Sequence, residues 1–316
     1  MSTWDMHRGN QSQVMDFIFL GLSDYPDLQI PLFVVFLCIY LITLIGNLTI
    51  LTLICIDSRL HTPMYFFLFN LGILDVGLTS STLPKMLSIF LMDSKSISFL
   101  GCMTQLYLLM SFTGVEFFLL TAMAYDRYVA ICNPLRYSVI MNKRVCALLA
   151  VIAWVLGLLD DLPHTVILCY SSYCGHNVIN HLFCDFRTML QLSCSDTSAS
   201  VLVMNILDFG LALLSLFFIL MSYSQIFYSI LKMQSMKGRY KAFSTCSSHL
   251  MVVSLYSGTV FFVYLRPVSK SISSADKLLD AFYSTVIPLL NPLIYSLRNK
   301  DIKAALTKEM KRRSGG

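Results

Sequence analysis

The stretch MAYDRYVAIC, residues 123–132, closes a long apolar segment and places three polar side chains in a row at its end. These are an acid, a base and a tyrosine: Asp126, Arg127 and Tyr128. Charged side chains are costly inside hydrocarbon, so this triplet belongs where a membrane-spanning helix meets water. An acid and a base that pair at such a boundary are typical of a signalling switch, which favours a receptor over a transporter or an enzyme.

The composition of the whole chain agrees with a membrane protein. The 316 residues are 56% hydrophobic and only 13% charged, with a mean hydropathy of +0.68, so there is too little polar surface to coat a soluble globule. A spanning helix needs about 20 apolar residues. We predict an all-α membrane protein, a single domain over 1–316, with helices at about 30–56, 63–88, 99–126, 145–169, 200–231, 241–265 and 275–296.

The basic residues predict how these seven helices are oriented. With residues 1–29 outside, 16 Lys and Arg residues lie on the inner side and 6 on the outer side, with Lys85 near an outer helix end. Basic residues concentrate on the cytoplasmic side of membrane proteins. We therefore expect a multi-pass plasma-membrane protein with an extracellular N-terminus and a cytoplasmic tail at 297–316. The net charge of +5 is an asymmetry across the bilayer and indicates no nucleic-acid partner.

Both termini carry short patterns. Asn10-Gln11-Ser12 matches a glycosylation acceptor on the predicted outer side, whereas the same pattern at Asn47 falls inside a helix. In the tail, residues 299–310 repeat apolar side chains at Ile302, Leu306 and Met310 between lysines. That spacing predicts a short amphipathic helix on the inner membrane surface, with a solvated tail as the alternative.

Four cysteines fall on the predicted outer side, in an oxidising compartment. They are Cys102, Cys174, Cys184 and Cys194, and they allow three pairings. Three of the four lie in the long connection at about 170–199, which is too polar to cross lipid. Because long loops with several cysteines are ordered by their disulfides, we expect this connection to form a lid over the bundle.

Two acids are predicted at mid-membrane depth, Asp75 in the second helix and Glu116 in the third. Asn47 and Asn291 lie at a matching depth in the first and seventh helices. Hard cations prefer oxygen ligands, so these side chains form a candidate sodium site. The alternative is a hydrogen-bonded network without an ion, and no other cofactor is expected.

Near the inner ends of the helices, several groups form a candidate switch. Arg127 can pair with Asp126 in one state and release in another. Pro292, in the sequence Asn291-Pro292-Leu293-Ile294-Tyr295, weakens the seventh helix beside a tyrosine that can swing. Tyr223 on the fifth helix could meet Tyr295 or Arg127 through its hydroxyl, or either tyrosine could be an interfacial anchor.

Four sequence blocks carry a resemblance to a known family. They are LHTPMYFFL at 60–68, MAYDRYVAIC at 123–132, KAFSTCSSHL at 241–250 and PLLNPLIYSLRN at 288–299. In this order, they resemble the odorant-receptor family of rhodopsin-like G-protein-coupled receptors over essentially the whole chain. The resemblance implies that an odorant enters between helices three, five, six and seven, and that a stimulatory heterotrimeric G protein then raises cyclic AMP.

The resemblance also implies roles for individual residues. Arg127 would face the G protein with Asp126 as its restraint, and the inner switch would include Tyr128, Tyr223, His249, Asn291, Pro292 and Tyr295. The two family disulfides map to Cys102–Cys184 and Cys174–Cys194, although Cys102–Cys194 has been assigned to such receptors as well. One departure concerns Ser257, which stands where the family has a second aromatic residue before Gly258.

A ligand pocket is predicted on the third helix by counting helical turns outward from Arg127, and residues of the fifth and sixth helices are added as plausible partners. The candidates are Leu106, Leu109, Met110 and Thr113 on the third helix, Leu207 and Leu211 on the fifth, and Ser257, Val260, Phe261 and Tyr264 on the sixth. Most are apolar, which suits a small volatile ligand held by shape and dispersion. Ordinary helix packing is the alternative for each.

Three acids interrupt the apolar surroundings of this pocket: Asp160 and Asp161 on the fourth helix and Asp208 on the fifth. An unpaired carboxylate there is costly. We hypothesise that one of them faces the cavity and favours a ligand with an amine or other hydrogen-bond donors. The alternatives are pairing with His164 or His181, protonation by burial, and solvent exposure.

Other classes of function fit less well. The histidines show no metal-ligand spacing, and no nucleophile has an evident base partner, so an enzyme is not expected. A transporter would need inverted repeats or a continuous polar stripe, which the sequence does not contain. The remaining alternative is a non-olfactory chemosensory receptor of the same fold.

Overall fold

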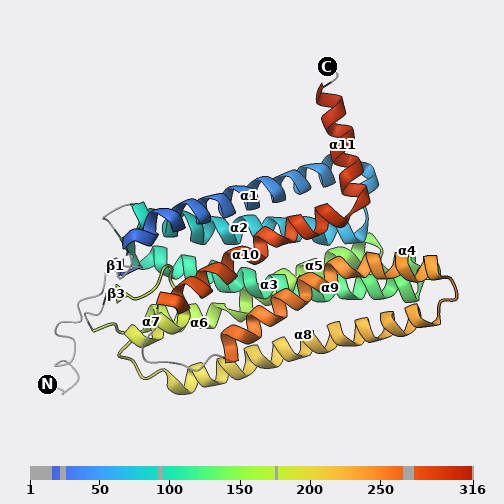
Figure 1. Cartoon of the computed structure of the whole chain (residues 1–316). Coiled ribbons are helices and arrows are strands. Elements are labelled where there is room, and N and C mark those ends of the chain that lie inside the picture. Colours follow the sequence, from blue (N-terminus) through green and yellow to red (C-terminus); the bar gives the residue numbers. More distant parts are fainter. Residues whose placement is uncertain (1–15, 22–25, 92–94, 175–176, 266–273, 315–316) are drawn as a thin grey trace.

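The computed structural model of the chain describes residues 16–21, 26–91, 95–174, 177–265 and 274–314. Within these ranges, the side chains of 26, 241, 245, 259–265, 274–276, 283, 296–298, 300 and 312–314 lie outside the described part. Long helices dominate the molecule and run side by side along one axis (Figure 1).

In the described part of the chain, the bundle consists of seven long helical rods, and one of them is broken into two helices. They are α1 (Gln29–Ile56), α2 (Pro63–Leu91), α3 (Phe99–Cys132), α5 (Lys143–Asp160) with α6 (Leu162–Tyr170), α8 (Ser198–Lys232), α9 (Met236–Leu265) and α10 (Ser274–Arg298). Among the described residues, six rods are long and apolar enough to cross a membrane, and α9 adds a further helix of 30 residues. The predicted all-α seven-helix membrane bundle is thereby confirmed.

Many large apolar side chains lie on the outside of the bundle. On α8, Leu202 and Ile206 are 60% and 62% exposed, whereas Ile226 on the same helix is fully buried. A helix that is apolar on all sides suits a bilayer, because lipid covers the outward face while neighbouring helices cover the inward one. α3 contacts α2, α5, α8 and α9, so it lies at the centre of the packing.

Several helices end at other residues than the sequence predicts. α3 continues to Cys132, so the Asp126-Arg127-Tyr128 triplet lies inside its last turns, and α9 begins at Met236. The predicted span 145–169 is interrupted at Asp161. Pro163, near the start of α6, has no N–H to donate to the preceding turn, which explains the interruption.

One end of the bundle, which we call the sheet end, carries a small β-sheet that was not predicted from the hydropathy pattern. β1 (Asp16–Phe19) lies between β2 (Ser96–Ser98) and β3 (Val178–Ile179), antiparallel to the former and parallel to the latter. Phe17 and Phe19 of β1 are buried, so the N-terminal strand belongs to the core of this end. The long connection also contains a short helix, α7 (Phe186–Leu192), and is thus an ordered cover.

The opposite end, which we call the α11 end, holds the short elements η2 (Ser58–Leu60), η3 (Pro134–Arg136) and α4 (Tyr137–Ile140). α11 (Lys300–Ser314) follows α10 and turns away from the bundle axis (Figure 1). Its predicted apolar stripe divides: Ile302 is buried, whereas Leu306 and Met310 are 39% and 63% exposed. The helix therefore packs through Ile302 and Ala305 in its first two turns and leaves Leu306 and Met310 largely uncovered.

Candidate functional site

At the α11 end, Arg127 and Asp126 of α3 form a buried ion pair. The Arg127 Nε donates to Asp126 Oδ2 at 3.0 Å, and its Nη2 donates to the same oxygen. The Tyr137 hydroxyl of α4 donates to the other carboxylate oxygen at 2.7 Å. Asp126 is fully buried and Arg127 is 9% exposed, so these charge-assisted bonds hold the guanidinium in place.

Tyr137 lies outside the spanning helices, and its hydroxyl stays protonated and able to donate. Burial, together with the Asp126 carboxylate, raises the pKa of Tyr137 well above its usual range, so its hydroxyl keeps its proton. Tyr128, the third residue of the predicted triplet, is half-buried, and its ring lies 6.1 Å from that of Tyr125. The structure therefore brings Tyr137, rather than Tyr128, to the pair.

A second connection joins α8, α9 and α3 one to two turns deeper in the bundle. The Tyr223 hydroxyl lies 2.6 Å from His249 Nδ1, and His249 Nε2 lies 3.1 Å from the carbonyl oxygen of Leu120. Because a carbonyl only accepts, Nε2 carries the proton, and Nδ1 accepts from the tyrosine. All three groups are buried, and both ring nitrogens of His249 are satisfied.

The predicted meeting of Tyr223 with Tyr295 or Arg127 is not what this structure contains, because His249 engages the Tyr223 hydroxyl. The Tyr295 hydroxyl is buried without a hydrogen-bond partner among the described residues. Pro292 lies against α1 at Gly46, where an added Cβ would come within 3.1 Å of its ring. The proline segment of α10 thus packs tightly on α1 while Tyr295 remains unbonded.

The predicted polar core is assembled around Asn291. Its Nδ2 donates to Asp75 Oδ1 at 3.0 Å and to Glu116 Oε1 at 3.1 Å, so one amide joins carboxyl groups from α2 and α3. The Asn291 Oδ1 is buried without a partner among the described residues. Asn47 also interacts with Asp75, and it donates to the backbone carbonyls of Thr43 and Pro288, which joins α1 to α10.

These residues suit a small hard cation better than a transition metal. The described residues contain no group of three or more His, Cys, Asp or Glu side chains that could hold a metal ion. Two carboxyl groups that share one amide would repel each other if both were ionised, and a proton or a cation would relieve that repulsion. The unpartnered oxygen of Asn291 adds a further neutral ligand of the type that sodium accepts.

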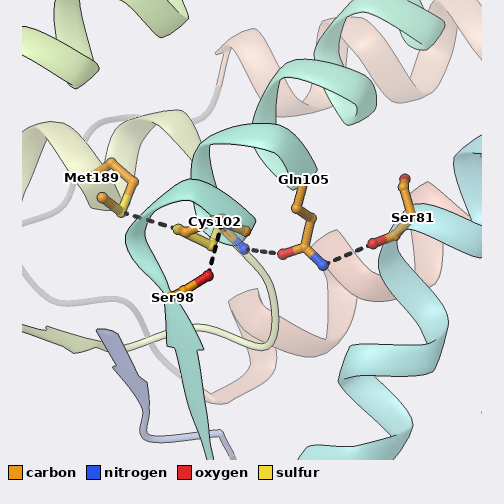
Figure 2. Close-up of a disulfide and its surroundings, with 7 residues drawn as sticks. Ser81, Ser98, Cys102, Gln105 and Met189 are labelled. Carbon is orange, nitrogen blue, oxygen red and sulfur yellow. Dashed lines mark hydrogen bonds between the residues drawn. A yellow bond between two sulfur atoms is a disulfide. The ribbon is translucent and has the colours of Figure 1, made fainter. Parts of the chain in front are cut away.

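At the sheet end, the structure pairs Cys102 with Cys184 and Cys174 with Cys194, and not Cys102 with Cys194. Figure 2 shows the first disulfide beside Gln105 of α3. Gln105 Oε1 accepts from the Cys184 N–H at 2.9 Å, and its Nε2 donates to the carbonyl of Ser81 on α2 at 2.9 Å. The buried amide therefore fastens the long connection to two helices.

The predicted pocket face of α3 is directed toward the bundle interior. Leu106 is fully buried, while Leu109, Met110 and Thr113 are half-buried. The Tyr256 hydroxyl of α9 donates to the carbonyl oxygen of Thr113 at 2.5 Å, which brings the predicted ligand face of α9 against that of α3. The contact of these four residues with a ligand stays a prediction.

The remaining pocket candidates divide. Leu211 is half-buried, and the Ser257 hydroxyl is buried without a partner among the described residues. Leu207 is 60% exposed and faces outward, so its assignment to the pocket was wrong. The next residue on α8, Asp208, points inward, and its side chain is 13% exposed. The side chains of Val260, Phe261 and Tyr264, and the whole of Asn10, lie outside the described residues.

One of the three acids near the pocket has a described partner. Asp208 Oδ2 lies 3.1 Å from His164 Nε2, which is one of the alternatives weighed for it. Asp161 is 8% exposed and Asp160 is half-buried. His181 does not pair with any of these three acids. Its Nε2 lies 3.4 Å from Asp280 Oδ2 on α10.

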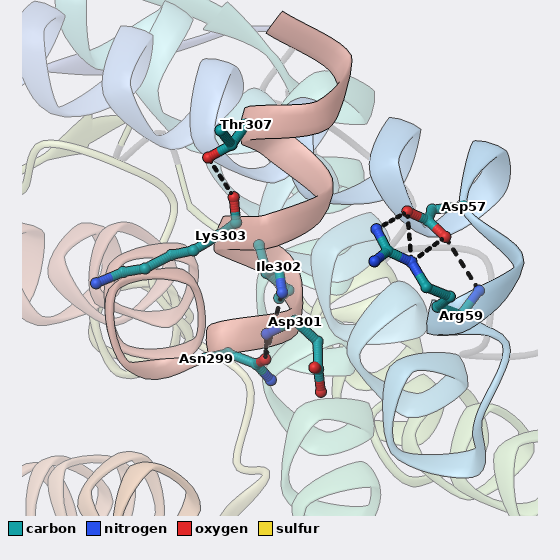
Figure 3. Close-up of polar contacts among 7 residues, drawn as sticks. All are labelled: Asp57, Arg59, Asn299, Asp301, Ile302, Lys303 and Thr307. Carbon is teal, nitrogen blue, oxygen red and sulfur yellow. Dashed lines mark hydrogen bonds and ion pairs between the residues drawn. The ribbon is translucent and has the colours of Figure 1, made fainter. Parts of the chain in front are cut away.

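The first turn of α11 is anchored to the bundle at the α11 end. Asn299 Oδ1 accepts from the N–H groups of Asp301 and Ile302 at 2.9 and 3.3 Å, which caps the helix (Figure 3). The Tyr65 hydroxyl of α2 lies 3.0 Å from the same oxygen. Nearby, the Arg59 side chain and backbone amide hold the pKa of Asp57 well below its usual range.

Sequence reasoning missed Tyr137, Gln105 and Tyr256. Tyr137 follows Pro134-Leu135-Arg136 between two predicted spanning helices, and no periodic pattern there directs its side chain toward Asp126. A glutamine inside an apolar span is itself a signal, because its amide needs partners there. Gln105 could therefore have been singled out beside Cys102 from the sequence.

Comparisons with known proteins agree with this geometry. The family model described as "Olfactory receptor" matches residues 36–313. "Olfactory receptor 5P60" of Mus musculus is 48% identical over 305 residues, covering 96% of this chain and 95% of that protein. "Olfactory receptor 1J4" of Homo sapiens is 49% identical over 301 residues, covering 95% and 96%. "Olfactory receptor 5AR1" of Homo sapiens is 46% identical over 309 residues, covering 98% and 100%.

These matches extend over both ends of the bundle and include every described residue of the switch and of the polar core. They indicate a receptor and not an enzyme. The chain belongs to the olfactory receptor family, as a multi-pass transmembrane G-protein-coupled receptor for odorants.

Proposed function

We propose that the chain binds a small, volatile odorant within the helix bundle and activates a stimulatory heterotrimeric G protein, which raises cyclic AMP. The observation that carries the proposal is the buried Asp126–Arg127 pair at the α11 end. A guanidinium held by one adjacent carboxylate can exchange that partner for an acceptor on another protein. The pair is thus a two-state element of the kind that an intracellular partner needs.

The His249 connections supply a route from ligand to switch. α9 contacts α3 near the predicted pocket through Tyr256, and contacts α3 again through His249 and Leu120. A ligand that binds better when α9 is displaced would break the second contact and release Tyr223. The freed hydroxyl could then reach Arg127 or Tyr295.

The orientation proposed is an extracellular sheet end and a cytoplasmic α11 end. The excess of basic residues on the α11 side supports it, 16 against 6 on the other. Both disulfides lie at the sheet end, where an extracellular location provides the oxidising conditions that they need. Glycosylation at Asn10 is expected on the same side.

A sodium ion is proposed as a ligand of the polar core. Asp75 and Glu116 would hold it, and the unpartnered Asn291 oxygen would complete the oxygen shell. Bound there, the ion would offset one of the two carboxylate charges and stabilise the arrangement in which α2, α3 and α10 meet.

The test is a screen of chemically diverse odorants in cells that express the full chain, with cyclic AMP as the readout. Wild type should respond to part of the panel, and Arg127→Ala should lose the response at equal surface expression. Arg144→Ala is the matched control, because Arg144 is exposed at the start of α5. A full response from Arg127→Ala would overturn the proposal.

A further inference from the structure

Residues 181–184 of the long connection, which we call the ceiling segment, cross the sheet end of the bundle from α10 to α3. At one end of the segment, His181 Nε2 lies 3.4 Å from Asp280 Oδ2 on α10. At the other end, the Cys184 N–H donates to Gln105 Oε1 on α3 at 2.9 Å. Both residues between these anchors are buried, so the segment is packed onto the bundle.

The ceiling segment lies next to the predicted pocket face of α3. Leu109 follows Gln105 by one helical turn on that face. Leu182 and Phe183 of the segment belong to one apolar cluster, and Leu109 packs against this cluster. The same cluster contains side chains of α1, α2 and α10. The ceiling segment therefore covers the compartment between these helices on the side of the predicted pocket.

His181 has an unused hydrogen-bonding atom in these apolar surroundings. Its side chain is 1% exposed, and its ring meets that of Phe183 edge-to-face at 4.4 Å. Its Nδ1 is buried without a hydrogen-bond partner among the described residues. The Tyr40 hydroxyl, on a side chain that packs against the same cluster, lies 3.2 Å from the Ser80 hydroxyl. A buried polar atom of this kind needs a water molecule or a ligand group as its partner.

The Asp280 carboxylate determines which partner Nδ1 of His181 requires. An ionised carboxylate only accepts, so the imidazole donates to it from Nε2, and the other nitrogen of the neutral ring is then an acceptor. The bond to Asp280 and the contact with Phe183 hold the ring from two sides. The ceiling segment thus presents one oriented acceptor, which needs a donor.

We propose that His181 is a ligand-binding residue whose Nδ1 accepts a hydrogen bond from the hydroxyl group of a small aliphatic alcohol. Asp280 is the positioning residue for the imidazole, and Leu109 contacts the carbon chain. A hydroxyl group is costly to bury without a partner, and a bond to Nδ1 satisfies both groups at once. The proposal rests on the proposed odorant binding inside the bundle.

The experiment compares unbranched alcohols with the methyl ethers of the same chains on the full receptor in cells, with cyclic AMP as the readout. An ether oxygen accepts and cannot donate. Wild type should respond to the alcohols at roughly 2- to 10-fold lower concentration, which corresponds to about 0.4–1.4 kcal/mol. His181→Phe keeps an aromatic ring and removes the acceptor, so this preference should disappear. Tyr170→Phe, at a side chain 87% exposed on α6, is the matched control and should keep it.

A positioning role for Asp280 is tested with the same ligands. Asp280→Ala removes the acceptor of the Nε2–H group, so the imidazole loses its fixed orientation and the preference for alcohols should shrink. Because the two residues act as one unit, the double variant with His181→Phe should match His181→Phe alone. A purely structural role of Asp280 would weaken the responses to alcohols and ethers equally, and this outcome would contradict the positioning role.

A second measurement needs no G protein. The melting temperature of the purified receptor is compared with and without each alcohol and each ether. A larger stabilisation by alcohols in wild type and not in His181→Phe supports the proposal even if cyclic AMP does not rise, in which case the proposed signalling alone would fail. Equal stabilisation by alcohols and ethers in wild type, or a preference that His181→Phe retains, would overturn it. A receptor that ethers stabilise and alcohols do not would keep odorant binding and overturn the role of His181.

Discussion

The hydroxyl of Tyr223 lies 2.6 Å from Nδ1 of His249, and the two rings are stacked 5.9 Å apart. The histidine uses its other nitrogen on the carbonyl of Leu120, so three helices meet through one neutral imidazole. α9 can move away from α3 at this level only if the hydrogen bond between His249 and Leu120 breaks. Each partner is buried, and breaking one bond leaves a polar group without a substitute.

Tyr223→Phe removes the donor and leaves His249 Nδ1 buried and unpaired. We expect a loss of about 1–3 kcal/mol in the stability of the ligand-free receptor, seen as a lower melting temperature. Tyr228→Phe is the matched control, because Tyr228 lies on the same helix with 57% of its surface exposed, and it should change stability by less than about 0.5 kcal/mol. Equal melting temperatures in the two variants would contradict the role given to the Tyr223–His249 bond.

Asp126→Asn tests the restraint on Arg127. The amide keeps the size of the side chain and loses the charge that holds the guanidinium, so the state in which Arg127 is released becomes more populated. We expect ligand-independent cyclic AMP, normalised to surface expression, to rise by roughly fivefold or more. Tyr137→Phe, which removes only the neutral donor to Asp126, should produce a smaller rise in the same assay. Unchanged basal signalling in Asp126→Asn would argue against a locked state.

The fold was predictable because hydropathy alone locates the helices, and the triplet Asp126-Arg127-Tyr128 orders them. What the sequence could not provide is the sheet. β1 is four residues long and pairs with β2 and β3, which lie far along the chain, so no local pattern reveals it. The interruption at Asp161 was likewise hidden, since Pro163 is compatible with a bend as well as with a new helix.

In the site, buried polar residues that need a charged or hydrogen-bonding partner were easier to predict than apolar residues whose role depends on which way the side chain points. Asp75, Glu116 and Asn291 need polar partners inside the bilayer, and Asn291 donates hydrogen bonds to both acids. Leu207 was assigned by counting turns, and one residue corresponds to about 100° around a helix, which is enough to turn a side chain from pocket to lipid.

Gln105→Met tests how the long connection is held. Methionine fills a similar volume and bonds to neither Ser81 nor Cys184, so a buried carbonyl and a buried amide lose their partner. We expect a destabilisation of about 1–3 kcal/mol, measured by thermal unfolding of the purified receptor. The control is Leu100→Met on the same helix, whose side chain is 74% exposed. If Gln105→Met and Leu100→Met had the same melting temperature, the hydrogen bonds of Gln105 would not contribute to stability.

The two disulfides predict a pattern among serine variants. Cys102→Ser and Cys184→Ser break the same bond, so each should reduce surface expression equally, and the double variant should be no worse than either. Cys174→Ser and Cys194→Ser should form a second such pair. Since residues that act as one unit are non-additive, this comparison separates the pairings. A deficit shared by Cys102→Ser and Cys194→Ser alone would favour the alternative Cys102–Cys194 bond.

The polar core predicts a dependence on sodium that differs from a general salt effect. An ion that binds the folded receptor stabilises it by about 1.4 kcal/mol when its concentration is tenfold above its dissociation constant. The melting temperature of wild type should therefore be higher in sodium chloride than in choline chloride of equal ionic strength. Glu116→Gln and Asp75→Asn each remove one charged ligand and should abolish this difference, whereas Asp27→Asn, at an exposed acid, should keep it. A wild-type receptor that melts at the same temperature in both salts would indicate that the carboxyl groups are held by Asn291 and a shared proton instead of a sodium ion.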